Sequence, residues 1–257
     1  MSIRNFLSAV YIVKNGSDLF RRSLESVVRI SDEIIVIDSG STDDTIAIAK
    51  AFGAHVVHHP WQGYGAQRQF AIESATHDCI LMLDADEVLR EEGANATLNA
   101  LPKVRQGVAF SMRRYNYIGN HLIRHGDWAR DSVVRLFHRD YGCFHAADVV
   151  HEQWYPTGPV EEIAGFAINH FPFSSYAGML IKLAKYSELN AEKVYTRGRP
   201  VPAHAPMSHA LAAFLRTYVL RLGVLDGMDG AAIAWTTALG AFMKYAMARE
   251  RQQVERR

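Results

Sequence analysis

The stretch CILMLDADEVL, from Cys79 to Leu89, leads from five apolar or neutral residues into two aspartates and a glutamate. A short apolar run of this kind is typical of a buried strand. Three similar apolar runs lie upstream in the chain, and helical segments of about ten residues separate the runs. The strand-like runs are NFLSAVYIV (5–13), EIIVID (33–38) and AHVVHH (54–59), and the helical segments are SDLFRRSLESVV (17–28), TDDTIAIAKAFG (42–53) and GAQRQFAIESA (65–75).

This alternation of strands and helices predicts βαβ units and therefore an α/β fold with a parallel sheet. In open α/β sheets, ligands bind outside the carboxyl ends of the strands. Asp38, Asp84 and Asp86 all fall at predicted strand ends. The sequence therefore predicts a ligand site along that edge of the sheet.

The pattern of apolar and polar residues changes from about Val108 onward. We expect strands in VAFSMRRYNYIG (108–119), SVVRLFHR (132–139) and IAGFAINHF (163–171), separated by polar and aromatic loops. After Phe173 the pattern becomes helical, with expected helices at 174–196, 207–225 and 230–250.

Composition and cysteine use restrict the class of protein. The chain has 257 residues, of which 49% are hydrophobic, so one large domain with an appendage can form a sizeable core. The two cysteines, Cys79 and Cys143, do not suggest a disulfide framework, and this fits a reducing compartment. The N-terminal stretch lacks the features of a signal peptide. We therefore expect a cytoplasmic protein.

The charge is distributed unevenly along the chain. Residues 1–171 carry 16 Lys/Arg against 21 Asp/Glu, and residues 172–257 carry 12 against 6. A basic, apolar tail suggests an anionic partner surface. Its longest uncharged run, Gly230 to Met243, has 14 residues, short of the ~20 that span a bilayer. These helices either lie on a membrane surface, pack on the catalytic domain, or form a homodimer.

The D-x-D triplet carries the chemistry. Two carboxylates one residue apart on an extended segment point in opposite directions, so only one easily ligates a metal directly. The other is then free to bind ribose or a metal-bound water. Mg²⁺ and Mn²⁺ favour oxygen ligands, and such an ion neutralises the charge of a nucleoside diphosphate leaving group. The alternative interpretation is a pair of solvated turn acids.

Two loops beside this triplet offer further candidates. In DSGSTDDT, Gly40 permits a tight turn, and Ser41 with Asp44 matches a helix capping box. Asp38 is not needed for that cap, and its carboxylate suits a nucleobase imide or a ribose hydroxyl. In GYGAQRQFA, Arg68 either reaches a base or phosphate or is a surface charge.

Three later residues have two interpretations each. Glu152, in DVVHEQW, is either a general base for an acceptor hydroxyl or a surface glutamate. His170, at a predicted strand end, either completes a metal shell or is structural. Trp154, like Trp128, either stacks on a sugar ring or packs in the core.

With these residues assembled, the chain resembles family 2 glycosyltransferases of the GT-A fold. The motifs AVYIVKN, EIIVIDSGSTDDT, PWQGYGAQRQFA and ILMLDADE carry the resemblance, in the family's order and spacing. More narrowly, HGDWARDSVVRLFHR, VHE and RTYVLRLGVLDGMDG are similar to the bacterial lipopolysaccharide core β-1,4-glucosyltransferase branch. The resemblance covers nearly all of the chain.

The resemblance implies an inverting transfer from a uridine diphosphate (UDP) sugar with Mg²⁺ or Mn²⁺. It implies that Asp38 binds the uracil or ribose end, that Arg68 lies near the base, and that Asp84 lies near the ribose. Metal ligation falls to Asp86 with His170. Other implied contacts to the nucleotide sugar are Val13, Asn15, Gly40 and Ala85; the implied catalytic base is Glu152; and Trp128, Arg135 and His151 are implied on the acceptor side.

The chain departs from the family pattern at two positions. Gly16 stands where the first motif usually has Glu, and Gln69 stands where the pair after the glycine-rich loop usually has Asn. These departures leave the metal site intact and bear on the contacts to the nucleotide.

We expect a nucleotide-diphospho-sugar transferase fold with a Rossmann-like, mainly parallel sheet. The catalytic domain spans 1–173, with a nucleotide-sugar half at 1–107 and an acceptor half at 108–173, and a helical extension follows at 174–257. Expected partners are a UDP-sugar and a lipid-linked or lipopolysaccharide-core acceptor, on the inner face of the cytoplasmic membrane, and no nucleic acid. Alternatives are a sugar nucleotidyltransferase and a non-catalytic scaffold in surface-polysaccharide assembly.

Overall fold

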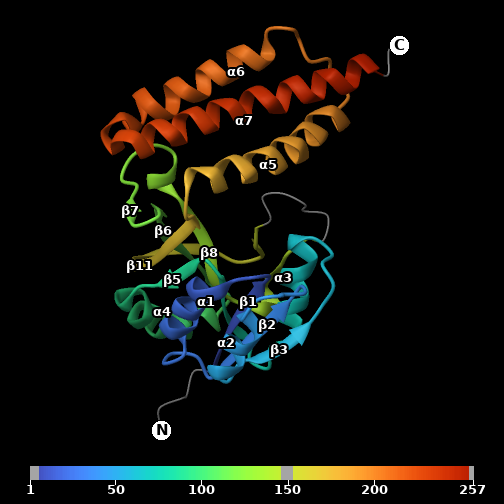
Figure 1. The fold of residues 1–257 in the computed structure, drawn as a ribbon. Helices are drawn as coiled ribbons and strands as arrows, with labels where there is room; N and C mark the ends of the chain where they lie inside the picture. Colours follow the sequence, from blue (N-terminus) through green and yellow to red (C-terminus); the bar gives the residue numbers. More distant parts are fainter. Residues whose placement is uncertain (1–5, 146–152, 255–257) are drawn as a thin grey trace. The chain divides into compact units, whose positions relative to one another are not determined.

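The protein divides into two compact units. The computed structural model describes residues 6–145 and 153–254. Residues 1–114 and 132–170 form one unit, called here the sheet unit, and residues 115–131 and 171–257 form the helical unit (Figure 1). Each unit is considered separately below.

Four parallel strands form the first half of the sheet, in the order β3-β2-β1-β4. This confirms the α/β architecture that the alternating pattern predicts. The strands are β1 (Leu7–Val13), β2 (Glu33–Asp38), β3 (His55–His58) and β4 (Cys79–Asp84), and the helices between them are α1 (Ser17–Val27), α2 (Thr45–Ala51) and α3 (Tyr64–Glu73).

The rest of the sheet is antiparallel, so the sheet as a whole is mixed. From β4 the order continues through β8, β6 and β11 to β5, and β7 pairs with β6. The remaining elements are β5 (Glu87–Leu89), α4 (Glu91–Val104), β6 (Ala109–Ile118), β7 (His121–Leu122), the 3₁₀ turns Trp128–Arg130 and Arg139–Tyr141, β8 (Ser132–His138), β9 (Gly142–Cys143), β10 (Tyr155–Pro156) and β11 (Val160–Phe173). The sequence did not predict β5 or α4, because β5 is too short to show alternation and α4 contains Gly93 and Pro102.

Both faces of the parallel strands are buried, which explains their continuous apolar runs. One core joins alternate residues of β1 and β4, such as Tyr11 and Leu81, to α1, α2 and α4. The other core joins the intervening residues, such as Val10 and Ile80, to α3 (Figure 1). Cys79 is a buried core residue, as expected.

The strand register brings the predicted site residues to one level of the sheet. Val13 pairs with Asp38, Ile12 pairs with Asp84, and Asp38 pairs with His58. The carboxyl ends of β1, β2, β3 and β4 therefore meet at one edge, where the sequence places a ligand site.

The helical unit is built on α7 (Gly227–Val254), which packs along both α5 (Tyr176–Thr196) and α6 (Ala205–Phe214) (Figure 1). None of the helices in the described residues combines the length and apolarity needed to span a bilayer. The single helix predicted at 207–225 is wrong in its second half. After α6 the chain forms a π-helical turn, Leu215–Leu220, and then a 3₁₀ turn, Gly223–Asp226.

The end of the predicted helix has a local cause. Leu222 adopts a left-handed backbone with φ of 59°, which stops helical propagation. Gly223 follows so close to the Thr217 carbonyl that a Cβ atom there would lie 2.6 Å from its oxygen. Periodicity does not reveal such a backbone reversal.

Residues 115–131 are attached to the rest of the helical unit by the buried Asp226 and the partly exposed Asp127. Asp226 accepts backbone N–H groups of Arg124 and His125, at 3.1 and 2.8 Å. Asp127 binds the guanidinium groups of Arg216 and Arg221. Sequence periodicity alone does not show that this loop and the C-terminal helices form one compact unit.

Candidate active site

The loops after β1 and β2 are joined by Asn15. Its backbone N–H donates to the Ser41 hydroxyl at 2.9 Å, and its side-chain oxygen accepts the N–H of Thr42 at 2.8 Å. This corrects the capping-box prediction, because Ser41 is used by the neighbouring loop. Helix α2 begins at Thr45 after Asp44, with no side-chain cap.

Gly16 fits this tight loop. A Cβ atom at position 16 would lie 2.8 Å from the Cβ of Phe20, closer than real side chains approach. The departure from the family's usual Glu therefore accompanies a close packing of the loop on α1.

Asp38 shapes the second loop. It is 1% exposed, and its carboxylate accepts the N–H groups of Gly40, at 2.9 Å, and Ser41, at 3.1 Å. Burial raises the pKa of Asp38, but the hydrogen bonds from Ser41 and Gly40 and the nearby His58 outweigh it, so the pKa lies below its ordinary value. This geometry gives Asp38 a role in holding the turn, and its contact with the base or ribose stays a prediction.

Asp84 is clamped by two arginines. Arg68 of α3 donates to one carboxylate oxygen at 2.6 Å, and Arg135 of β8 donates to the other at 2.5 Å. Arg68 is 4% exposed, which rules out the surface-charge interpretation. Arg135 is 3% exposed and lies beside the D-x-D turn with these acids, and its acceptor contact stays a prediction.

Glu87 extends this cluster. It is fully buried, and it accepts from Arg135 at 2.7 Å and from Arg114 at 3.2 Å. Its second oxygen accepts the backbone N–H of Asp84 at 3.0 Å, which fixes the turn between β4 and β5. We call Arg68, Arg114, Arg135, Asp84 and Glu87 the arginine cluster.

The acids and arginines of the arginine cluster stabilise one another's charged forms. Burial raises the pKa of Asp84, but Arg135, Arg68 and Arg114 hold it well below its ordinary value. Burial likewise lowers the pKa of Arg135, while Asp84 and Glu87 raise it above its ordinary value. Three guanidinium groups face two carboxylates, so the cluster carries a net positive charge.

Asp86 lies apart from the arginines. Its carboxylate is 3.6 Å from the Nε2 atom of His170, and its side chain is 34% exposed. Pairing of β11 with β5 sets His170 opposite Glu87, which brings the imidazole to the turn. The two aspartates have different partners: Asp84 pairs with Arg68 and Arg135, and Asp86 lies near His170.

Asp86 and His170 fit a divalent ion as a donor set. A carboxylate oxygen and an imidazole nitrogen both suit Mn²⁺, and Mg²⁺ uses one or two carboxylates with substrate phosphates. No Lys or Arg within the described ranges pairs with Asp86. Nor do the described residues contain a group of three His, Cys, Asp or Glu placed to hold a metal. Two protein ligands therefore leave the remaining positions to substrate and water.

The remaining predicted residues are placed as follows. Val13 is buried at the end of β1, where its carbonyl accepts the N–H of Ser39, and Ala85 packs on the core. Trp154 stacks on Phe137 at 4.0 Å in the core, so its sugar-stacking interpretation is wrong. His151 and Glu152 lie outside the described residues.

Trp128 is part of a small core in the helical unit. Its ring stacks on Phe173 at a centroid distance of 5.7 Å, and its carbonyl accepts the Asn116 side chain at 2.8 Å. Packing therefore accounts for this tryptophan as the structure shows it.

Sequence reasoning missed Glu87 and Arg114. Both carried a signal. Arg114 lies on the same face of β6 as Met112 and Asn116, which are both buried. A charged side chain on a buried face needs an oppositely charged or hydrogen-bonding partner. Glu87 follows the D-x-D triplet directly and begins the next strand.

Comparison with known proteins adds independent evidence. The model of the family described as Glycosyl transferase family 2 matches residues 8–176, well over half of the chain. An uncharacterized glycosyltransferase of Rickettsia conorii is 28% identical over 268 residues, covering 97% of this chain and 92% of that protein. The lipopolysaccharide core biosynthesis glycosyltransferase LpsC of Rhizobium meliloti is 26% identical over 253 residues, covering 94% and 93%.

A solved structure supports the fold. The crystal structure of S. aureus TarS is similar with a TM-score of 0.50 at 12% sequence identity. The match covers 90% of this chain and 55% of that chain, so this chain spans about half the length of TarS. At this identity the likeness bears on the fold alone.

Proposed function

The chain belongs to glycosyl transferase family 2, and from this premise we propose that it moves a hexose, such as glucose, from a UDP-sugar to a lipid-linked glycan. The protein is a glycosyltransferase, as are the named relatives over most of its length. The proposed acceptor is the lipopolysaccharide core or a similar glycan, which the similarity to LpsC supports. The proposed transfer inverts the anomeric configuration.

One observation carries the proposal for the donor. At the carboxyl end of β4, Asp86 is turned away from the arginine cluster toward His170 and stays a third exposed. In the proposal Asp86 and His170 hold Mg²⁺ or Mn²⁺, which when bound neutralises charge on the donor diphosphate.

The residues around Asp86 then position the donor. The net positive charge of the arginine cluster attracts the diphosphate, and Asp84 and Glu87 hold the guanidinium groups of Arg68 and Arg135 in place. The loops joined by Asn15 offer backbone groups to the nucleoside. Asp38 keeps the second of these loops in a single conformation.

The acceptor step is assigned to Glu152. As a general base it removes the proton from an acceptor hydroxyl, whose oxygen attacks the anomeric carbon from the face opposite the diphosphate. The new glycosidic bond forms as the bond to the diphosphate oxygen breaks, and configuration is inverted. General-base catalysis of this kind contributes roughly 10²–10⁴-fold to the rate.

The helical unit is proposed to hold the enzyme at an anionic membrane face. Large apolar side chains, each at least 44% exposed, gather along α6, the two turns after it, and the first part of α7. We call this set the apolar surface: Met207, Leu211, Leu215, Val219, Leu220, Leu222, Val224, Leu225, Met228, Trp235 and Leu239.

The arrangement of the apolar surface supports a lipid partner. Met207 and Leu211 on α6 and Leu215 directly after it recur every four residues, and the ring centroid of Phe214 lies 4.7 Å from that of Trp235 on α7. Exposed patches of this kind mark protein or membrane contacts. Residues 172–257 carry 12 Lys/Arg against 6 Asp/Glu, a balance that favours anionic lipids. A homodimer on the same surface is the competing outcome.

A transfer assay tests the proposal. We expect the purified protein to release UDP from a UDP-hexose when acceptor lipid and Mn²⁺ are present, with product of inverted configuration by NMR. Glu152→Gln is expected to lose turnover by at least about 10²-fold and to keep donor binding. Equal turnover in Glu152→Gln removes its role, and release of pyrophosphate from a nucleoside triphosphate favours the nucleotidyltransferase alternative.

A further inference from the structure

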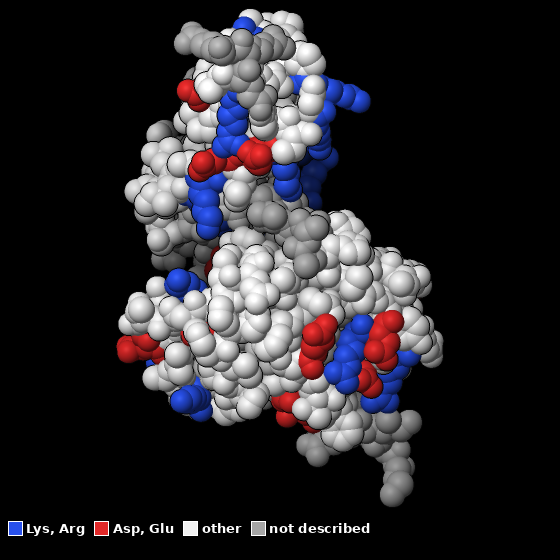
Figure 2. All heavy atoms as spheres, turned by 90° about the vertical axis from the view of Figure 1, so that its right-hand side faces the viewer, with Lys and Arg blue, Asp and Glu red and all other residues white. Residues whose placement is uncertain are grey.

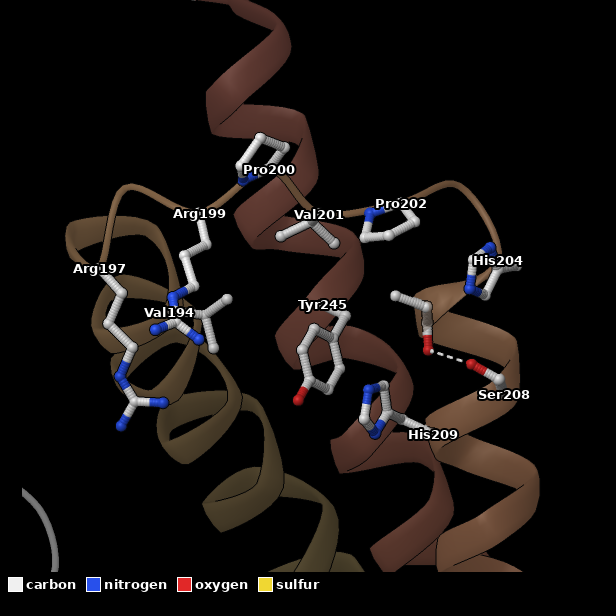
Figure 3. A pocket seen from close by; sticks show the side chains of 11 residues that line it. Val194, Arg197, Arg199, Pro200, Val201, Pro202, His204, Ser208, His209 and Tyr245 are labelled. Atoms are coloured by element: carbon white, nitrogen blue, oxygen red, sulfur yellow. Dashed lines mark hydrogen bonds between the residues drawn. The ribbon is translucent and has the colours of Figure 1, made fainter.

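A cavity of about 280 Å³ opens in the helical unit where α5 ends and α6 begins (Figure 3). Its walls come from the end of α5, the link to α6, the first turns of α6, and one residue of α7. The lining residues are Val194, Arg197, Arg199, Pro200, Val201, Pro202, His204, Ala205, Ser208, His209 and Tyr245.

The lining is rich in positive charge and hydrogen-bond donors. It includes Arg197 and Arg199, and no Asp or Glu is among the lining residues. Neither guanidinium makes an ion pair within residues 6–145 and 153–254. The two acids of α5, Glu188 and Glu192, are both engaged by Arg251 of α7. The positive charge at the cavity is therefore not neutralised by the acids of the preceding helix.

The link that carries these arginines is held in place. The side chain of Gln252 on α7 accepts the N–H of Val201 at 3.0 Å and donates to the carbonyl of Arg199 at 2.8 Å. Arg249 donates to the carbonyl of Val201 at 2.8 Å. Val201 is only 7% exposed, so the link is anchored in the core of the unit. Arg197 and Arg199 therefore extend from a fixed backbone.

The opposite wall adds further donors. Helix α6 begins at Ala205, and His204, Ser208 and His209 bring polar side chains to the cavity from this end of the helix. Tyr245 stacks on His209 at 4.1 Å. Figure 3 shows Tyr245 between the α5 side, which bears the arginines, and the α6 side, which bears the histidines.

We propose that this cavity binds the phosphate group of a phosphorylated ligand. Arginine forks make paired, charge-assisted hydrogen bonds to phosphate oxygens, and two of them line this cavity together with His204, Ser208, His209 and Tyr245. The volume accommodates a phosphate with part of the group to which it is attached. The ligand is either a phospholipid headgroup or a soluble phosphorylated sugar, which share this chemistry.

The experiment measures phosphate binding directly, without any nucleotide sugar, so its result is independent of the transfer reaction. Inorganic phosphate is titrated into the full chain by calorimetry. The test variant is Arg197→Ala with Arg199→Ala. The matched control is Arg124→Ala with Arg130→Ala, which removes the same charge from exposed positions of the same unit. Circular dichroism verifies that both variants are folded.

We expect the test variant to raise the Kd for phosphate by about tenfold or more and the control to change it by less than about twofold. Absence of saturable binding to the unmodified chain, or equal weakening in both variants, overturns the proposal. A second arm uses phosphatidylcholine vesicles with or without phosphatidic acid. Vesicle binding that depends on phosphatidic acid and on the two arginines identifies a lipid headgroup as the ligand. Phosphate binding without such vesicle binding identifies a soluble phosphorylated ligand.

Discussion

The two units differ in where they place charged side chains and large apolar side chains. The sheet unit buries Arg135 and Glu87 and pairs both of them, Arg135 also with the partly exposed Asp84. The helical unit exposes large apolar side chains such as Leu220, at 77%, and leaves basic residues at its surface (Figure 2). Buried, paired charges hold a geometry for chemistry, whereas exposed apolar groups beside basic ones await a partner. In our proposal this contrast separates the donor site from the membrane-attachment surface.

The largest effect is expected from breaking the buried charges. Arg135→Ala removes one ion-pair partner from Asp84, which keeps Arg68, and one from the fully buried Glu87, which keeps Arg114. We expect the free energy of unfolding to fall by about 3 kcal/mol, measured by urea denaturation. Lys103→Ala is the control, since its pair with Glu161 is exposed, and it is expected to cost less than about 1 kcal/mol. Equal losses in the two variants contradict the proposed importance of the cluster.

The pH dependence of stability tests how much the ionised forms of Asp38 and Asp84 contribute to the fold. Asp38 and Asp84 both have folded pKa values below the ordinary carboxyl value. Their ionised forms therefore stabilise the fold above the unfolded pKa of about 3.9, and this contribution is lost as the pH falls through the folded values. We expect unfolding scans to show stability declining below about pH 4. Asp84→Asn is expected to flatten that decline, and an unchanged profile argues against the assignment.

The helical unit is tested by placing charge on the apolar surface. Leu220→Glu with Leu225→Glu is expected to reduce sedimentation with anionic vesicles by about tenfold, because both side chains are more than half exposed. The melting temperature is expected to stay nearly constant. Leu98→Glu with Val160→Glu, in the sheet unit, adds the same charge and is expected to leave sedimentation unchanged. A variant that alters only the oligomeric state, measured by light scattering, supports a homodimer instead.

The sequence predicts the sheet unit better than its site. Continuous apolar runs identify β1 to β4, and the spacing of Asp84 and Asp86 predicts their opposite directions. The role of Asp38 was not predictable, because it depends on backbone N–H groups two and three residues on. Ser41 matched a local pattern, but a residue of another loop, Asn15, uses its hydroxyl.

The arginine cluster was only partly predictable. The resemblance singles out Arg68 and Arg135, but no sequence pattern indicates that both converge on Asp84. Their convergence depends on the order in which β8 and β6 follow β4, and strand order is a property of the whole chain. The apolar surface was visible as uncharged runs, whereas the turn at Leu222 was hidden because non-glycine residues seldom adopt that backbone.

The most direct test of the account is whether the side chain of Asp86 makes UDP binding depend on a divalent ion. In a thermal-shift experiment with UDP near 100 times its Kd, we expect Mn²⁺ to raise the melting temperature of the unmodified protein by roughly 5–10 °C. Without ligands, Asp86→Asn is expected to melt at the same temperature as the unmodified protein. With UDP, it is expected to show no metal-dependent rise in melting temperature. An undiminished rise in Asp86→Asn would contradict the account.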